Sequence, residues 1–318
     1  MGELSESVPV VSVVILTYRH EPYIRAAIES VLAQQVSFPI EVLISDDSSP
    51  DKTWEIVNEY REHPWVRLLQ HCREDVIMIN GRPTGRHNWH QALLAARGEY
   101  VAYLDGDDFW TSPHKLQRQV DALRKYSDAS LCFHSIERLE QSTGKKRVVV
   151  PWNAHVGYRF SHHVCHNRIS SVSVMWRRTM MPLPFDETLL RRVPVGDYAV
   201  HAYCLDRGPG IFLPEVMATY RVHSGGIHQV YSTGQRDFGA MVLQLKRLLM
   251  EVLPSRRLEL ERGIAATQSA QVLNLLRQDR INEARKVAGV LKWRNIPRMP
   301  RYAARFVVAK LRVRAARS

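Results

Sequence analysis

The N-terminal third of the chain alternates between short apolar runs and segments with helical spacing of apolar residues. Runs rich in Val, Ile and Leu that are bounded by turns predict buried strands, whereas apolar residues three and four positions apart predict helices. Strands are expected at 10–18, 40–45, 66–70 and 100–104, and helices at 22–35, from residue 51, and at 86–97. This order predicts an α/β fold with a mainly parallel sheet flanked by helices.

Acidic residues follow two of these predicted strands directly. Asp46 and Asp47 end the 40–45 run, and the sequence DGDD at 105–108 ends the 100–104 run. Because parallel strands end at one edge of a sheet, we expect both turns to border one crevice, where such sheets bind ligands. Clustered carboxylates favour a hard divalent cation, and such cations usually bring phosphates. The alternative is that such an acidic turn only caps the next helix. The occurrence of two acidic turns at one edge of the sheet argues against this alternative.

The C-terminal part has a different pattern. From residue 235 to 290 apolar residues keep helical spacing throughout, which predicts two or three helices packed on the preceding part or on a partner subunit. We therefore divide the chain into a main domain, 1–230, and a helical C-terminal extension, 231–318.

Composition and cysteine usage limit the class of protein. The chain has 318 residues, 45% of them hydrophobic, enough for a sizeable core. Its four cysteines are scattered, which is typical of reduced thiols rather than of a disulfide framework. The N-terminal sequence MGELSESVP is unlike a secretory signal, and no apolar run is long enough to cross a bilayer. These features predict a cytoplasmic protein.

The net charge of +12 is concentrated toward the C-terminus. In 301–318 basic and apolar residues are interleaved, as in helices that lie on anionic lipid. This pattern predicts peripheral contact with the inner face of the cell membrane, and the alternative is a solvated helical tail. The charge alone also suggests nucleic-acid binding, but no nucleic acid is expected as a partner because the basic and aromatic residues match no recognised binding module.

Six motifs resemble those of one enzyme family. They are VSVVILTY followed by Glu21, ISDDSSPDKT, GRHNWHQALLAARGEY, LDGDDFWTSPHKLQRQV, VGDY and EVMATYRVHSGG, in this order. The resemblance is to the family 2 glycosyltransferases, which have the Rossmann-like nucleotide-sugar-binding fold called GT-A. It is dense over 10–123, patchier to 226, and absent from the last part of the chain. It implies a GT-A catalytic domain at 1–230, with a nucleotide-sugar-binding half, 10–123, and an acceptor half, 124–230.

The resemblance implies a nucleotide-sugar site at the strand ends. The residues that match the family's donor-binding motifs are Thr17, Tyr18, Glu21, Asp46, Asp47, Arg86, Asn88, Asp105 and Gly106. In the family, the acidic pair after the second strand includes the carboxylate that hydrogen-bonds the base, which makes a UDP-sugar the favoured donor. Arg86 and Asn88 match positions near the ribose and the diphosphate.

The resemblance also implies a site for Mn²⁺ or Mg²⁺ at the DGDD motif. Asp107 is the expected metal ligand, and Asp108 is expected to orient its neighbours. His223, in TYRVHSGG, is assigned to the metal shell or to the diphosphate, with an ordinary loop residue as the alternative. A metal at this place would act as a Lewis acid toward the leaving diphosphate.

Transfer of a sugar to a hydroxyl needs a base that accepts the proton. In the family this base is an acidic residue at the start of a later helix, and the matching residue is Asp197 in PVGDY. A carboxylate at such a position is also a common helix cap, which is the alternative interpretation.

Two further features lie near these motifs. Trp110, two residues after the acidic turn, is assigned to acceptor binding as a stacking surface, with a core aromatic as the alternative. The cluster His162, His163, Cys165 and His166 fits no structural zinc spacing, and we interpret it as acceptor loop or polar surface.

Together these features predict an inverting, metal-dependent hexosyltransferase that acts on a cell-surface polysaccharide or a lipid-linked glycan. Inversion rests on the resemblance alone. A metal-dependent nucleotidyltransferase is the alternative, because such enzymes also combine a parallel sheet with carboxylates. It is disfavoured since the loop after the first strand, TYRHEPY, has no glycine for a phosphate-binding turn.

Overall fold

The computed structural model describes residues 8–79, 81–152, 157–182, 191–226 and 237–289. Its main sheet consists of β1 (Val11–Thr17), β2 (Ile40–Asp46), β3 (Val66–Gln70), β6 (Tyr100–Asp105), β7 (Phe109–Trp110), β8 (Leu131–Glu140), β9 (Lys145–Val149), β10 (Met175–Arg177) and β11 (Gly210–Val222). The order is β3-β2-β1-β6-β10-β8-β11-β7, and β9 pairs with β8 outside this path. A separate hairpin is formed by β4 (Met78–Ile79) and β5 (Arg82–Pro83).

The four strands predicted from the apolar runs are confirmed, and they pair in parallel. β1 lies between β2 and β6, and β2 pairs with β3. All of β2 and nearly all of β1 are buried, as expected for strands that helices cover on both faces. The register places Thr17 beside Asp46 and Leu16 beside Asp105. The two acidic turns therefore follow strands on either side of β1 and lie at the same edge of the sheet.

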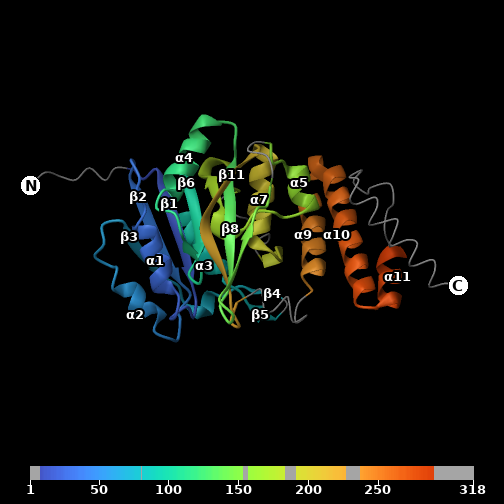
Figure 1. Ribbon diagram of the computed structural model, residues 1–318, viewed down its shortest axis with the longest axis horizontal. Coiled ribbons are helices and arrows are strands. Elements are labelled where there is room, and N and C mark those ends of the chain that lie inside the picture. Colours follow the sequence, from blue (N-terminus) through green and yellow to red (C-terminus); the bar gives the residue numbers. More distant parts are fainter. Residues whose placement is uncertain (1–7, 80, 153–156, 183–190, 227–236, 290–318) are drawn as a thin grey trace, which may run out of the picture.

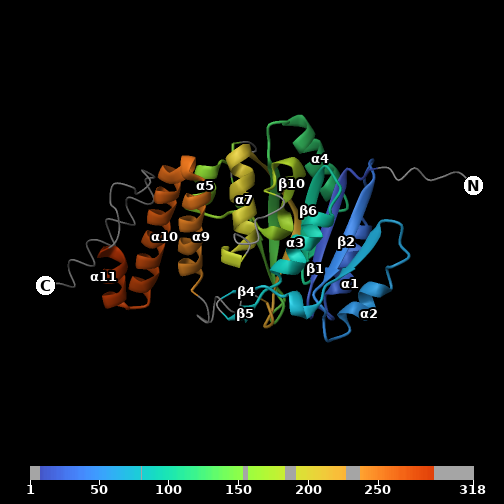
Figure 2. The ribbon, with the colours of Figure 1, turned by 180° about the vertical axis from the view of Figure 1, so that it is seen from behind.

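Helices cover the two faces of the sheet and form two hydrophobic clusters with it (Figures 1 and 2). One cluster includes α1 (Ile24–Leu32), α2 (Thr53–Asn58) and α4 (Lys115–Lys125). The other includes α3 (Arg86–Ala95), α5 (Phe160–Cys165) and α7 (Gly196–Arg207). The helices α3 and α7 both begin at the edge of the sheet where the parallel strands end.

The second half of the sheet has mixed strand directions. β10 runs antiparallel between β6 and β8, whereas β8 and β11 are parallel. β7 pairs antiparallel with β11, so that Trp110 lies beside Ala218 and Phe109 beside Thr219. Because β7 directly follows the DGDD turn, this pairing places the end of β11, and His223 after it, next to the turn.

The helical prediction for 235–290 is confirmed by α9 (Phe238–Val252), α10 (Arg257–Arg277) and α11 (Ile281–Gly289), which lie side by side at one end of the molecule (Figure 1). The apolar face of α9 joins the same hydrophobic cluster as α3 and α7. Lys246 of α9 is buried, and its Nζ donates a hydrogen bond to the carbonyl oxygen of Gly263 on α10 at 2.9 Å. Among the described residues, no helix has both the length and the apolar content to cross a membrane.

The His162–His166 cluster lies on α5 and just after it, in contact with α7. His163 is buried, its Nε2 lies 3.1 Å from the carbonyl oxygen of Tyr198, and the Tyr198 hydroxyl donates to the carbonyl oxygen of His163 at 2.9 Å. Burial lowers the pKa of His163 to about 3. His163 thus links two helices, and its burial corrects the interpretation as polar surface for this residue, whereas His162, Cys165 and His166 are partly exposed. The segment 301–318, with its predicted membrane contact, lies outside the described residues.

Candidate active site

The DGDD turn closes tightly against the end of β1. The Gly106 amide donates to the carbonyl oxygen of Leu16 at 2.8 Å. A Cβ at position 106 would lie 2.8 Å from His20 Nδ1 and 3.0 Å from the Leu16 carbonyl oxygen. Only glycine fits this contact, and it places the carboxylates on either side of it at the crevice.

Asp105 lies at the end of β6 and is held by two hydroxyl groups. The Tyr103 hydroxyl donates to its Oδ1 at 2.6 Å, and Ser171 Oγ donates to its Oδ2 at 3.3 Å. Burial, together with the nearby charges of Asp107 and Asp197, raises the pKa of Asp105 to about 7. The influence of Asp197 means that α7 presents its first-turn carboxylate to the same space as the DGDD turn.

Asp107 is paired with a histidine from the end of β11. Its Oδ2 accepts a hydrogen bond from His223 Nε2 at 3.0 Å, and His20 Nε2 lies 3.8 Å away. Burial alone would raise the pKa of Asp107, but the His223 hydrogen bond and the neighbouring His20 lower it below its usual value. Asp107 therefore stays ionised next to carboxyl groups whose pKa values are raised.

Asp108 is buried and contacts the end of β11. It is 1% exposed, and its Oδ1 accepts a hydrogen bond from the Arg221 amide at 2.7 Å. Burial, followed by the charges of Asp107 and Asp105, raises the pKa of this carboxyl well above its usual value. Asp108 thus fastens the end of β11, two residues before His223, to the acidic turn.

Asp107 and His223 bring together a carboxylate and an imidazole, two kinds of group that can ligate a divalent cation. A separation of 3.0 Å equals that of two adjacent ligands on an octahedral ion with bonds of about 2.1 Å. Carboxylates suit Mg²⁺ and Mn²⁺ alike, whereas an imidazole ligand favours the transition metal, Mn²⁺. Within the described residues no group of three or more His, Cys, Asp or Glu side chains could hold a metal ion. A cation held by this pair would have to take its remaining ligands from elsewhere, such as diphosphate oxygens or water.

The basic side chain of Arg221 lies over this pair. Its guanidinium carbon is 4.5 Å from the centre of the Phe109 ring and 5.2 Å from that of Tyr23, whose ring also packs against His223 at 4.7 Å. These contacts hold a half-buried cation beside Asp107, where a diphosphate bound to the metal would need one.

The first acidic turn, after β2, uses its two carboxylates within the protein. Asp46 is fully buried and accepts hydrogen bonds from the Ser49 amide and hydroxyl at 2.8 and 2.5 Å. Asp47 is 2% exposed and pairs with Arg73 Nη1 at 2.8 Å. The Arg73 guanidinium carbon lies 4.3 Å from the centre of the Tyr18 ring. Tyr18, Asp47 and Arg73 thus form one wall with an aromatic face, an acceptor and a cation, which suits a nucleobase.

Beside this wall, two residues that are not glycine have left-handed backbone conformations. Arg19 has φ of 59° and Ser48 has φ of 53°. The Arg19 amide donates to Ser49 Oγ at 3.0 Å, and Ser48 Oγ donates to the carbonyl oxygen of His71 at 2.6 Å. Such conformations cost about 1–3 kcal/mol and cluster at ligand sites. Glu21 closes the same loop, since its Oε2 accepts from the Lys52 amide at 3.2 Å.

The other residues predicted to bind the nucleotide sugar differ in whether their polar atoms are already used within the protein. Thr17 is buried at the end of β1, and its Oγ1 has no hydrogen-bond partner among the residues that the structure describes. Asn88 is also buried and exchanges hydrogen bonds with Ser45, so its side chain fixes α3 to β2. Arg86 begins α3 and faces α7, because a Cβ at Gly196 would lie 3.6 Å from Arg86 Nη1.

Asp197 lies in the first turn of α7 and accepts a hydrogen bond from the Tyr198 amide at 2.8 Å. Burial raises its pKa, and the charge of Arg86 opposes the increase. A carboxylate with a raised pKa beside the crevice is suited to accept a proton. The donor of this hydrogen bond is the amide of the next residue in the same helical turn, a contact that the capping alternative also predicts.

The structure corrects the assignment of Trp110 to acceptor binding. Trp110 is 4% exposed, belongs to the cluster formed with α1 and α4, and has Lys115 Nζ 4.0 Å from its ring centre. It is a core residue, the alternative that the sequence left open. Conversely, sequence analysis missed Arg73, Tyr103 and Ser171. No motif includes Arg73 or marks the other two, and only the fold brings them to Tyr18 and Asp105.

A mainly parallel sheet with carboxylates, a histidine and arginines at its carboxyl edge is typical of α/β enzymes that bind nucleotides. The chain matches the family model described as glycosyl transferase family 2 over residues 12–179, more than half of its length. It belongs to this family, as its motifs predict.

Two relatives are each 34% identical to part of this chain. An uncharacterized protein of Mycobacterium tuberculosis is 34% identical over 228 residues, which are 71% of this chain and 63% of that relative. The UDP-Glc:alpha-D-GlcNAc-diphosphoundecaprenol beta-1,3-glucosyltransferase WfaP of Escherichia coli is 34% identical over 111 residues, 35% of this chain and 39% of that enzyme. The chain thus spans less than two thirds of the length of these relatives.

Solved structures confirm the GT-A-like α/β fold. Residues 1–349 of S. aureus TarS superpose with a TM-score of 0.53 at 14% identity, covering 94% of this chain and 88% of that one. The mannosyltransferase PcManGT from Pyrobaculum calidifontis, solved with GDP-Man and Mn²⁺, gives a TM-score of 0.51 at 16% identity, covering 96% and 87%.

Proposed function

We propose that this protein is an inverting, metal-dependent glycosyltransferase that uses a nucleotide-diphosphate sugar. The observation that carries the proposal is the Asp107–His223 pair, 3.0 Å apart, at the edge where Asp105 and Asp197 also lie. Asp107 and His223 would hold Mn²⁺ or Mg²⁺, which as a Lewis acid would neutralise the leaving diphosphate. The wall of Tyr18, Asp47 and Arg73 would bind the base, with UDP favoured.

The side chains have separate tasks in this reaction. Asp197 accepts the proton of the acceptor hydroxyl while the hydroxyl oxygen forms a bond to the anomeric carbon of the sugar. The bond from that carbon to the diphosphate oxygen breaks, and the electron pair leaves with the nucleoside diphosphate. Arg221 and Arg86 stabilise the negative charge that develops on the leaving group. Attack opposite the leaving group inverts the anomeric centre.

The acceptor is proposed to be a cell-surface polysaccharide or a lipid-linked glycan. The family relationship and the specificity printed for the E. coli relative support a carrier-bound acceptor. In this proposal 10–123 binds the donor, 124–230 binds the acceptor, and 301–318 contacts the inner face of the membrane. A metal-dependent nucleotidyltransferase remains the second candidate, but no described feature favours it over sugar transfer.

A thermal-shift panel tests the proposal. UDP, GDP, dTDP and CMP are each added with and without Mn²⁺, because a ligand that binds the native state raises the melting temperature. We expect a shift with one nucleoside diphosphate, UDP, only when Mn²⁺ is present. Absence of a shift with all four would contradict the proposal. A second assay then distinguishes sugar transfer from nucleotidyl transfer. The matching UDP-sugar is incubated without acceptor, and slow hydrolysis to free sugar and UDP is expected of a glycosyltransferase.

A further inference from the structure

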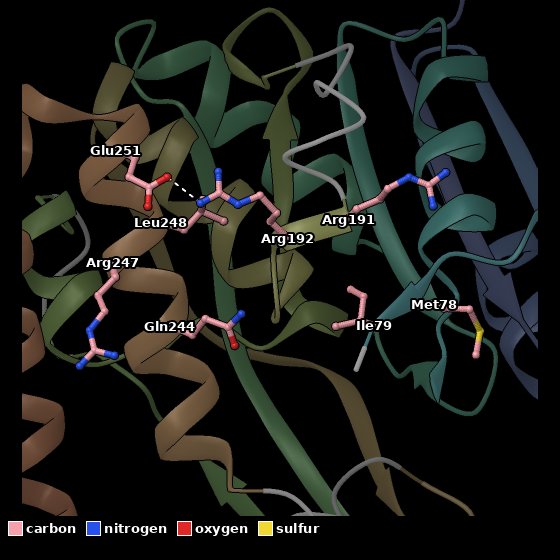
Figure 3. A pocket seen from close by; sticks show the side chains of 8 residues that line it. All are labelled: Met78, Ile79, Arg191, Arg192, Gln244, Arg247, Leu248 and Glu251. Atoms are coloured by element: carbon pink, nitrogen blue, oxygen red, sulfur yellow. Dashed lines mark hydrogen bonds and ion pairs between the residues drawn. The ribbon is translucent and has the colours of Figure 1, made fainter. Parts of the chain in front are cut away.

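A cavity of about 360 Å³ lies between the β4–β5 hairpin, the segment before α7, and α9 (Figure 3). Its lining residues are Met78, Ile79, Arg191, Arg192, Gln244, Arg247, Leu248 and Glu251. Its volume is in the range of small-molecule sites. None of these residues belongs to the nucleotide-sugar site described above.

The cavity is strongly basic. Three of its lining residues are arginines and one is a glutamate. Arg192 Nη2 donates to Glu251 Oε2 at 2.7 Å, and both side chains are about half exposed, 51% and 56%. Figure 3 shows Arg192 reaching across to Glu251 on α9, with Arg191 and Arg247 on opposite sides of the cavity. An ion pair this exposed is weak, so an anion can displace Glu251 from Arg192.

The lining is also apolar on one side. Met78 is 53% exposed although it is a large hydrophobic residue, and Ile79 and Leu248 continue the apolar surface into the core. In Figure 3 Ile79 and Met78 lie across the cavity from Gln244 on α9. Arginines together with an apolar wall fit a ligand that carries both an anionic group and a hydrocarbon chain.

The position of the cavity relates it to the proposed acceptor. Arg192 precedes Asp197 by five residues, so the two Cα atoms are at most about 18 Å apart. An anion at Arg192 would therefore lie within the length of a short glycan from the base.

We propose that this cavity binds the diphosphate, and the first hydrocarbon units, of an acceptor whose sugar is carried on a polyprenyl diphosphate. The inference rests on the proposed function, because it identifies the class of acceptor for that reaction. Arg192 and Arg247 bind the phosphate oxygens, Met78 and Ile79 contact the chain, and Glu251 competes for Arg192 until the anion arrives.

Titration calorimetry of the full chain with farnesyl diphosphate tests this inference. The titration is made in EDTA, so that the metal-dependent donor site does not bind the probe, and repeated with saturating UDP and Mn²⁺. We expect binding under both conditions. Arg192→Gln and Arg247→Gln should each weaken it about threefold to tenfold. Glu251→Gln should tighten it about twofold to fivefold, since a competing carboxylate is lost.

Controls separate the parts of the proposal. Arg257→Gln, at an exposed arginine of α10 that does not line the cavity, should leave the affinity unchanged. Met78→Ser should weaken binding of farnesyl diphosphate but not of pyrophosphate. Equal affinity for pyrophosphate and farnesyl diphosphate would refute the hydrocarbon contact, and displacement by UDP with Mn²⁺ would place the probe in the donor site instead.

The inference and the proposed function fail in different ways. If UDP with Mn²⁺ raises the melting temperature but farnesyl diphosphate does not bind, only the acceptor inference is wrong. If neither ligand binds, the proposed function is wrong as well. Unchanged affinity in both arginine variants, with unchanged melting temperatures, would also overturn the inference.

Discussion

The two acidic turns at the edge of the sheet have similar sequences and different surroundings. After β2, Asp46 is satisfied by Ser49 and Asp47 by Arg73. After β6, Asp107 is hydrogen-bonded to His223, lies 3.8 Å from His20 and remains 19% exposed in its side chain. The first turn is completed by the protein itself, whereas the second leaves an ionised carboxylate for a ligand.

The difference shows that the role of a carboxylate in such a motif depends on the groups that contact it. Carboxylates that accept hydrogen bonds from their own loop build the site, as Asp46 does. A carboxylate placed among like charges has a raised pKa, as Asp105 has next to Asp107, and such a group gains most from a cation. The first turn therefore supports the shape of the nucleotide wall, and the second is suited to the chemistry.

The largest expected effect separates the two turns directly. Asp107→Asn should abolish the Mn²⁺-dependent shift with UDP and lower sugar transfer by about a thousandfold or more, since a metal supplies several kcal/mol. The matched variant Asp46→Asn should keep the Mn²⁺-dependent shift and instead lower stability by about 1–2 kcal/mol. Thermal shift and a transfer assay on both variants measure the contrast. An unchanged metal response in Asp107→Asn would move the metal site elsewhere.

The next largest effect is expected at Asp197, which lies outside both acidic turns and is the proposed base. Asp197→Asn should leave UDP binding with Mn²⁺ intact and lower the turnover number about 10²–10⁴-fold, because the amide cannot accept the hydroxyl proton. Donor affinity and turnover are measured on the same preparation. Full turnover in this variant would mean that the base is another group and that Asp197 only caps α7.

Much of this arrangement could be predicted from the sequence. The apolar runs of β1, β2 and β6 are bounded by turns, so their burial and parallel order could be predicted from the pattern, whereas β3 is buried only at Val66. The acidic turns could be placed at one edge for the same reason. The environment of Trp110 could not be predicted, because an aromatic residue next to a motif can line a crevice or pack in the core. The pairing of β7 with β11 buries Trp110 in the core.

Partners supplied from distant parts of the chain were beyond the sequence. Ser171 reaches Asp105 from 66 positions away, and no local spacing signals such a contact. The division of labour between Asp46 and Asp47 was equally hidden, because it depends on which carboxylate Ser49 reaches and which faces Arg73. Sequence patterns fix which face is buried, while these pairings depend on the full packing.

A smaller effect is expected from the glycine of the second turn. Gly106→Ala places a methyl group against the Leu16 carbonyl oxygen and His20, which should cost about 1–3 kcal/mol and weaken Mn²⁺-dependent UDP binding by displacing Asp107. The matched control is Gly225→Ala, whose Cβ would meet His223 at an ordinary 3.5 Å. Thermal melts and Mn²⁺ titrations should show a loss only in Gly106→Ala, and equal losses would mean that the close contact at β1 does not position the acidic turn.

The last effect is on stability alone, and it tests whether the Asp47 carboxylate of the first turn is satisfied by Arg73. Arg73→Gln leaves the buried Asp47 carboxylate without its cation and should lower stability by about 1–3 kcal/mol. Burial already raises the pKa of Asp47, and loss of Arg73 raises it further, so the folded variant binds a proton more readily than its unfolded chain. Its stability deficit relative to the wild type should therefore grow as the pH rises above the pKa of Asp47 in the folded wild type, up to the higher pKa in the variant.

A double variant completes this test. Arg73→Gln combined with Asp47→Asn removes both charges and should recover most of the lost stability, because no unpaired buried charge remains. It should also remove the pH-dependent part of the deficit. Urea unfolding of the two single variants and the double variant gives the coupling energy. A coupling near zero would mean that Asp47 is not satisfied by Arg73, and the contrast between the two acidic turns would then lose its basis.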